Sequence, residues 1–244
     1  MTAPPKAEAL LRTWELGAKA AAPTRAWLML CAGQPDQPGH ALAGFSVGQR
    51  DAQLLELREQ LFGPSFECVT RCPQCEQLVE SAFSADDIRL PHAESGITFD
   101  VEAEGYTTRC RLPTCADLIA LEAEADADAV RQRLLDRCLL RANPPPSEVP
   151  TNGLPESLAA RIAQRMAELD PQAEVMLHLT CPHCGHPWHA PFVIGQHLWS
   201  EIDQWARSLL NDIHALASRY GWSEADILAM SAVRRQVYLE MLAT

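Results

Sequence analysis

The chain has 244 residues, of which 47% are hydrophobic and 21% are charged, a composition typical of a globular protein with one large or two small domains. Acidic residues outnumber basic ones by 32 to 20, and the formal net charge of −12, without a cluster of Lys and Arg, disfavours nucleic-acid binding. No apolar run approaches the roughly 18–20 residues of a membrane span, and residues 1–19 show no signal peptide. We therefore expect a cytoplasmic protein without a membrane span.

The pattern of apolar residues in the first quarter of the chain predicts helices. Apolar residues recur at helical spacing within residues 7–33, where Pro23 is suited to open a second helix. Ser46 is a predicted N-cap of the next helix, which Gly63-Pro64 ends. On that helix we expect Glu56, Arg58 and Glu59 to face solvent. Residues 1–63 are thus a predicted N-terminal helical region.

The middle of the chain mixes a hairpin with helices. Residues 97–112 alternate apolar and polar side chains around Glu104-Gly105, which predicts a β-hairpin. Thr114, with Asp117 three residues on, is a predicted cap of the helices that follow. The apolar stripe of these helices continues through Leu139. Asn143-Pro144-Pro145-Pro146 is expected to end the last of them, and residues 143–153 are a predicted polar linker or surface loop.

The last part of the chain is predicted to be helical. Pro155 opens a helix that closes at Asp170-Pro171, and the longest helix is expected over residues 196–220, ending at Gly221. Ser223 and Ser231 are predicted caps of two short final helices. This pair carries few basic residues, so we interpret it as a packing or partner-docking element rather than a DNA-reading one.

Two Cys-Pro-x-Cys segments form an internal repeat, TRCPQCEQLVESAF (70–83) and LTCPHCGHPWHAPF (179–192). In both, an apolar residue follows the first cysteine by seven positions and a Phe follows it by eleven. The matched positions are Cys72 and Cys181, Cys75 and Cys184, Val79 and Trp188, and Phe83 and Phe192. An apolar strand candidate precedes each segment. The repeat therefore predicts two copies of a strand, turn and strand unit.

The chemistry of this repeat favours a metal. Two such turns supply the four sulfurs of a closed tetrahedral site, for which zinc is well suited, with Cys72, Cys75, Cys181 and Cys184 as the ligands. A closed site has no position for water, so we expect Zn²⁺ to be structural rather than catalytic. The two halves are separated by the 105 residues 76–180, whereas a compact ribbon has about 15–20, which indicates an insertion.

The expected fold is therefore α+β, predominantly helical, with a small split zinc ribbon and an inserted subdomain of β-hairpin and helices. The predicted regions are residues 1–63 (N-terminal helices), 64–87 (first ribbon half), 88–177 (inserted subdomain), 178–195 (second ribbon half) and 196–244 (C-terminal helices).

Other interpretations of the role of the cysteines stay open at this point. Cys181-Pro182-His183-Cys184 alone is typical of a thiol-disulfide oxidoreductase, but Gly185-His186-Pro187 is poor helix material and a second copy has no role there. Two metal-free buried cysteine pairs are a further alternative, and His186 could replace one cysteine ligand. The five remaining cysteines are predicted to be small buried apolar residues: Cys31, Cys68, Cys110, Cys115 and Cys138.

Four stretches together resemble a family from contractile phage tails and related injection systems, described as baseplate proteins or baseplate hub assembly chaperones. They are RDAQLLELREQLFGPSFECVTRCPQCEQLVE (50–80), CRLPTCADLIAL (110–121), DPQAEVMLHLTCPHCGHPWHAPF (170–192) and residues 197–242. The resemblance implies a non-enzymatic structural or assembly protein whose partners are baseplate hub, spike or other tail proteins, present in the cytoplasm or incorporated into a tail-like particle. It places metal ligands on Cys72, Cys75, Cys181 and Cys184.

The sequence contains no convincing catalytic triad, phosphate-binding loop or HExxH pattern, so we predict that the chain is not an enzyme. The alternatives to the assembly protein are a zinc-ribbon nucleic-acid or transcription accessory factor and, less favoured, the oxidoreductase.

Overall fold

The computed structural model describes residues 4–94, 96–103, 105–143 and 154–242. Helices dominate, three small antiparallel sheets accompany them, and four cysteines cluster at one point. The predicted α+β class is confirmed. The division into five regions stays a prediction, and almost all of the predicted linker, residues 144–153, lies outside the described residues.

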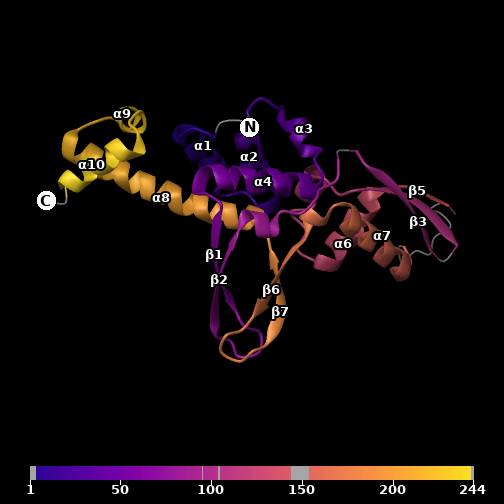
Figure 1. The fold of residues 1–244 in the computed structure, drawn as a ribbon. Helices are drawn as coiled ribbons and strands as arrows, with labels where there is room; N and C mark the ends of the chain where they lie inside the picture. The colour runs from indigo at the N-terminus through magenta and orange to yellow at the C-terminus, as the bar shows by residue number, and fades with distance from the viewer. Residues whose placement is uncertain (1–3, 95, 104, 144–153, 243–244) are drawn as a thin grey trace.

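A helical body forms the centre of the molecule (Figure 1). It consists of α1 (Ala7–Gly17), α2 (Ala22–Gly33), α3 (Gly39–Ala43), α4 (Val47–Phe62) and the first half of α8 (Ile194–Tyr220). Ser46 caps α4 as predicted, accepting a hydrogen bond from the Gln49 N–H while the Gln49 side chain accepts from the Ser46 N–H.

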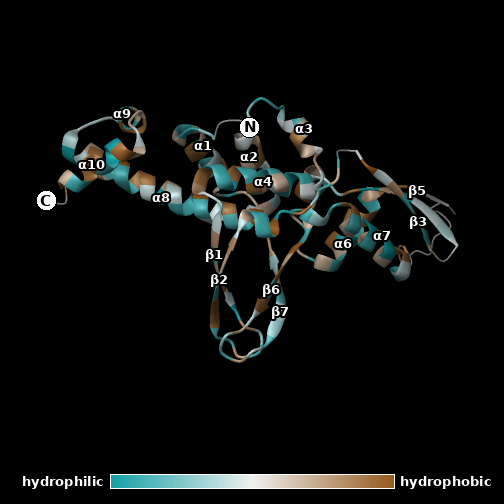
Figure 2. Ribbon diagram, viewed as in Figure 1, coloured by the Kyte–Doolittle hydropathy of each residue, from teal (hydrophilic) through white to brown (hydrophobic). Residues whose placement is uncertain are grey.

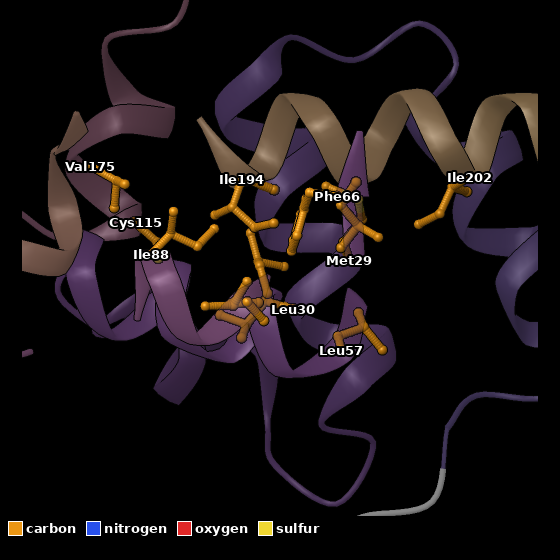
Figure 3. Packing of buried hydrophobic residues seen from close by; sticks show 14 of the residues in the cluster. Met29, Leu30, Leu57, Phe66, Ile88, Cys115, Val175, Ile194 and Ile202 are labelled. Atoms are coloured by element: carbon orange, nitrogen blue, oxygen red, sulfur yellow. The ribbon is translucent and has the colours of Figure 1, made fainter. Parts of the chain in front are cut away.

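The core of the body gathers residues from distant parts of the chain. Met29 and Leu30 of α2 pack there with Ile202 of α8 and with Phe66, the second residue of the first strand (Figure 3). These four side chains have at most 1% of their surface exposed. Apolar and polar residues alternate along α4 and α8 in Figure 2, as expected of helices with one buried side. The first strand is therefore anchored in the same core as the helices.

Two β-ribbons project side by side from this body (Figure 1). The first consists of β1 (Ser65–Arg71) and β2 (Leu78–Ser84), and the second of β6 (Val175–Thr180) and β7 (Pro187–Phe192). Each is an isolated antiparallel pair, and the Cys-Pro-x-Cys segments form the turns at their far ends. β7 leads directly into α8.

The chain between the ribbons lies at one end of the body (Figure 1), and part of it shares the body's core through Ala85, Ile88 and Cys115. It comprises the short helix η1 (Ala85–Ile88), β3 (Thr98–Ala103), β4 (Tyr106–Arg111), α5 (Cys115–Ala120), α6 (Ala127–Cys138), β5 (Leu139–Asn143), α7 (Glu156–Leu169) and the short helix η3 (Pro171–Ala173). The predicted hairpin is present as β3 and β4, and α7 packs against β3 with a core of its own. Thr114 and Asp117 form the predicted cap of α5.

One strand was not predicted. The helix expected to run through Leu139 ends at Cys138, and residues 139–143 pair with β4 as β5. Leu139 continues the apolar helical spacing, so the local pattern cannot distinguish the two structures. Pairing with β4, about thirty residues earlier in the chain, decides in favour of a strand.

The C-terminal helices lie at the opposite end of α8. Gly221 ends α8 in the left-handed conformation (φ 70°), and the Ser223 side chain caps α9 (Glu224–Leu228). α10 (Ala232–Leu242) follows, and Ile227 is fully buried between these helices. Among the described residues, no helix combines the length and the hydropathy needed to cross a membrane.

Candidate metal centre

The two ribbons have the same strand register. Phe66 pairs with Phe83 in the first ribbon, and at the matching position, 109 residues later on both strands, Val175 pairs with Phe192 in the second. The match continues to the tips, where Arg71 pairs with Leu78 and Thr180 with Pro187. The sequence repeat is thus also a repeat of structure.

The turns at the two tips share their backbone hydrogen bonds. In the first turn the Cys72 N–H donates to the Gln77 carbonyl at 2.9 Å, and in the second the Cys181 N–H donates to the His186 carbonyl at 3.0 Å. The Cys72 and Cys181 carbonyls each accept from the residue four positions on, Glu76 or Gly185, at 2.9 Å. That residue has a positive φ in both turns, 59° for Glu76 and 74° for Gly185. Glu76 adopts a conformation that usually favours glycine, because the turn requires it.

The four predicted ligands come together at these tips. The Sγ atoms of Cys72, Cys75, Cys181 and Cys184 all lie within 4.8 Å of one another. Cys72 and Cys184 are 3.8 Å apart, and their repeat equivalents Cys181 and Cys75 are 3.6 Å apart. In a tetrahedral site with Zn–S bonds of about 2.3 Å, neighbouring sulfurs are about 3.8 Å apart. The donor set and its dimensions therefore fit one zinc ion, while ligation itself stays a prediction.

The electrostatics of the cluster favour a cation. Desolvation opposes ionisation of Cys181, but hydrogen bonds from the N–H groups of Cys184 and His183 and from the Cys75 and Cys184 thiols together outweigh it and lower the pKa of Cys181 to about 6. For Cys75, a hydrogen bond from the Gln77 N–H is outweighed by desolvation and by the three neighbouring cysteines, which raise its pKa to about 12. Four thiols at this spacing ionise together only when a cation balances their charge.

Apolar side chains at matched positions pack against each other along the ribbons. Val79 and Trp188 lie with the cysteines at the tips. At the base, Phe83 and Phe192 meet edge to face at a centroid distance of 5.5 Å, and Phe66 stacks on Phe83 at 5.2 Å. The repeat residues that the sequence singled out thus hold the two ribbons together at both ends.

Arg58 has a position that the sequence did not predict. It was expected to be solvated, but only 4% of its surface is exposed. Its Nε and Nη2 groups donate to the two carboxylate oxygens of Glu201 on α8 at 3.0 and 2.7 Å, and its guanidinium lies 3.8 Å from the Phe66 ring centroid. The partner is 143 positions away in the chain, so no local pattern contains this contact. Arg58 ties α4 and α8 to the base of the first ribbon.

The histidines near the second turn lie outside the cluster. Among the described residues, the four cysteines are the one group of three or more His, Cys, Asp or Glu side chains close enough to share a metal ion. His183 is exposed, and the ring of His189 meets that of His178 on the facing strand edge to face at a centroid distance of 4.2 Å. His197 contacts the aromatic rings at the ribbon base instead. The structure therefore does not support His186 as a replacement ligand.

The surroundings of the second Cys-Pro-x-Cys turn differ from those of a redox dithiol. Reactive dithiols of the thioredoxin type lie at the start of a helix, whose N-terminus stabilises the thiolate. Here the turn joins two strands, β6 and β7. Of the five other cysteines, Cys110, Cys115 and Cys138 are buried as predicted, and Cys31 and Cys68 are half-buried.

Comparison with known proteins found no protein-family model that matches the chain, and neither curated proteins nor solved structures gave a match.

Proposed function

We propose that this chain is a non-enzymatic structural or assembly protein in which one zinc ion holds two distant segments together. The observation that carries the proposal is the convergence of four cysteine Sγ atoms, within 4.8 Å of one another, from two ribbons that the chain forms over a hundred residues apart. Four thiolates fill a tetrahedral coordination sphere, so the ion has no open position for a substrate. Its contribution is to fix the positions of the two ribbon tips.

The donor chemistry supports zinc over other metals. Thiolate ligands favour zinc, copper(I) or iron, and a lone tetrahedral site of four sulfurs is typical of zinc or iron. Zinc has no redox activity and no geometric preference of its own, which suits a structural site. When bound, zinc would supply a cationic centre that neutralises Cys72, Cys75, Cys181 and Cys184.

We further propose that the assembly is a contractile phage-tail-like baseplate, with hub, spike or other tail proteins as partners. This step depends on the sequence resemblance over residues 50–80, 110–121, 170–192 and 197–242. These stretches include both cysteine turns, α8 from its fourth residue on and the C-terminal helices. They therefore coincide with the ribbon pair and with the long helix that extends from it.

Metal analysis of the purified chain tests the zinc site. We expect one zinc per chain in the wild-type protein and its loss in Cys181→Ser, whereas Cys31→Ser, a half-buried cysteine outside the cluster, keeps the metal. Chelation should expose four thiols while the circular dichroism of the helices changes little. A chain without bound metal, with a rapidly alkylated Cys181, would contradict the proposal and favour a redox dithiol.

Affinity purification from the producing cells tests the assembly. Hub, spike or tube proteins among the co-purified partners would support a baseplate role. Tight binding to DNA or RNA at low salt, where phosphate contacts are strongest, would instead favour a nucleic-acid accessory factor.

A further inference from the structure

A cavity lies on the helical body, away from the ribbon tips. It has a volume of about 380 Å³ and opens between α2, α4, α5 and the start of α8. Its volume is in the lower range of small-molecule sites. Its apolar wall includes Leu118, Val193 and Trp199, and its polar groups are Gln196 and two arginines, Arg25 and Arg50.

Arg50 has donors that the protein does not use. Only 6% of its surface is exposed, and its Nε group donates to Asp51 Oδ1 at 2.8 Å. Among the described residues, its two Nη groups have no acceptor. Within the part of the chain that the structure describes, Thr70 Oγ1 is the one side-chain N or O atom that is both fully enclosed and without a partner. The Nη groups of Arg50 also have no partner there, so they are not fully enclosed and must face open space. The cavity that Arg50 lines provides that space.

The other groups around the cavity also favour an anion. The first residues of two helices line it, Ala22 of α2 and Gly195 of α8, and their N–H groups have no intrahelical acceptor, whereas Pro23, which also lines it, has no N–H. Arg25 adds a second positive charge above the Trp199 ring, 4.7 Å from its centroid. No Asp or Glu is among the described residues that line the cavity, although the chain has a net charge of −12.

Asp51 limits the charge that the site offers. It is 6% exposed and accepts from Arg50 Nε, so one side of the guanidinium is already paired within the protein. The unpaired side presents two N–H donors, which match the two oxygens of a single carboxylate. The apolar wall fits a ligand whose carboxylate is attached to a hydrocarbon body.

We propose that this cavity binds an apolar monocarboxylate, whose carboxylate accepts hydrogen bonds from the Nη groups of Arg50 and whose hydrocarbon part lies against Leu118 and Trp199. Two sources have this chemistry, a free small carboxylic acid and the C-terminal carboxylate of a peptide that ends in an apolar residue. The proposal does not depend on the zinc site or on the baseplate role.

Titration calorimetry with the full chain tests the proposal. The probes are hexanoate, for a free acid, and N-acetyl-leucine, for a chain terminus, each compared with its neutral amide. We expect at least one acid to bind about tenfold or more tightly than its amide, because the amide cannot accept a bidentate, charge-assisted pair. Preference for one acid over the other identifies the source. Equal binding of acid and amide, or no binding of either acid, would overturn the proposal.

Variants test whether the acid binds in this cavity. Arg50→Lys keeps the charge but removes the two-pronged donor and should weaken acid binding about tenfold or more. Val193→Trp fills the wall beside the helix start without altering Arg50, and it should weaken binding to a similar extent; it decides the question if Arg50→Lys does not fold. Arg207→Gln, an exposed arginine further along α8, is the matched control and should bind as the wild type does. Unchanged affinity in Val193→Trp would place the ligand elsewhere.

Discussion

Gly48 is a position where one added methyl group should lower the free energy of unfolding. It is the second residue of α4, and its N–H donates to Asp170 Oδ2 at 2.9 Å, while Asp170 Oδ1 accepts from the Ala93 N–H at 3.0 Å. A Cβ atom at position 48 would lie 2.1 Å from Asp170 Oδ1, far inside contact distance. In Gly48→Ala, the carboxylate must therefore move away from both donors.

The size of the effect follows from the two lost hydrogen bonds. Asp170 is only 2% exposed, so both N–H donors would lose a charged acceptor in a place that water does not easily reach. Leaving a buried donor unsatisfied costs about 1–3 kcal/mol, and alanine regains up to about 1 kcal/mol through its helix propensity. We expect Gly48→Ala to lower the free energy of unfolding by about 1–6 kcal/mol, the cost of two donors less the gain in propensity.

Urea unfolding followed by circular dichroism measures this change, and hydrogen exchange at the Ala93 amide locates it. Gly195→Ala is the matched control, because Gly195 is likewise the second residue of a helix, but its added Cβ would meet Ala26 Cβ at an ordinary 3.4 Å. We expect the control to match the wild type or exceed it by up to about 1 kcal/mol. Equal stability of the two alanine variants, with unchanged exchange at Ala93, would refute the proposed role of Asp170.

Two further predictions concern buried side chains. Phe66→Ala should lower the free energy of unfolding by about 3–5 kcal/mol in the same urea assay, because it empties a fully buried site in the core, whereas Leu78→Ala, at a side chain that is 57% exposed, should change it by no more than about 0.5 kcal/mol. Burial opposes ionisation of Asp117, but hydrogen bonds from Arg111, Thr114 and Arg137 outweigh it and hold the pKa of Asp117 well below its usual range. The folded state therefore binds fewer protons than the unfolded one, so this stabilisation is complete above the unfolded pKa of about 3.9 and is lost as the pH falls below it. Thermal unfolding at pH 7 and pH 3 should show a smaller pH-dependent loss of Tm in Asp117→Asn than in the wild type, and an identical loss would contradict this assignment.

Features with a local cause could be predicted from the sequence. The caps at Ser46 and Thr114 and the end of α8 at Gly221 depend on residues within one helical turn, and all three are present. The cysteine cluster could be predicted because the repeat carries its own register. Matching positions seven and eleven residues after each first cysteine define the same hairpin twice.

Features that depend on distant partners could not be predicted. Arg58 is buried because Glu201 lies opposite it, 143 positions away, and Gly48 is required because Asp170 lies 122 positions away. β5 exists because β4 presents a free edge, although its first residue continues a helical stripe. The Arg50 cavity is likewise assembled from four separate segments. In each case the sequence shows the residue but not the neighbour that determines its role.

The neck of the insertion, where Leu90 and Pro91 meet Gln172, explains how two ribbons so distant in sequence can share one candidate metal site. Gln172 is 2% exposed, its N–H donates to the Pro91 carbonyl at 3.1 Å, and its side-chain oxygen accepts from the Leu90 N–H at 2.6 Å. These bonds close the insertion where it leaves the first ribbon and where it returns to the second. In the folded chain the ribbon bases are therefore held together without a metal.

The tips have less support from the protein: there, Val79 and Trp188 pack with Cys72, Cys75 and Cys181 in a small cluster. A two-stranded ribbon is at best marginally stable alone, and the aromatic contacts of Phe66, Phe83 and Phe192 are confined to the base. Between base and tip, Cys68 and Ser81 are half-buried and Thr70 Oγ1 has no partner within the described residues. Two such narrow hairpins bury little apolar surface at their ends, so the proposed metal ion would supply the cross-link that a larger core provides elsewhere. Removing the metal should consequently free the tips first, while the Gln172 neck and the helical body stay folded.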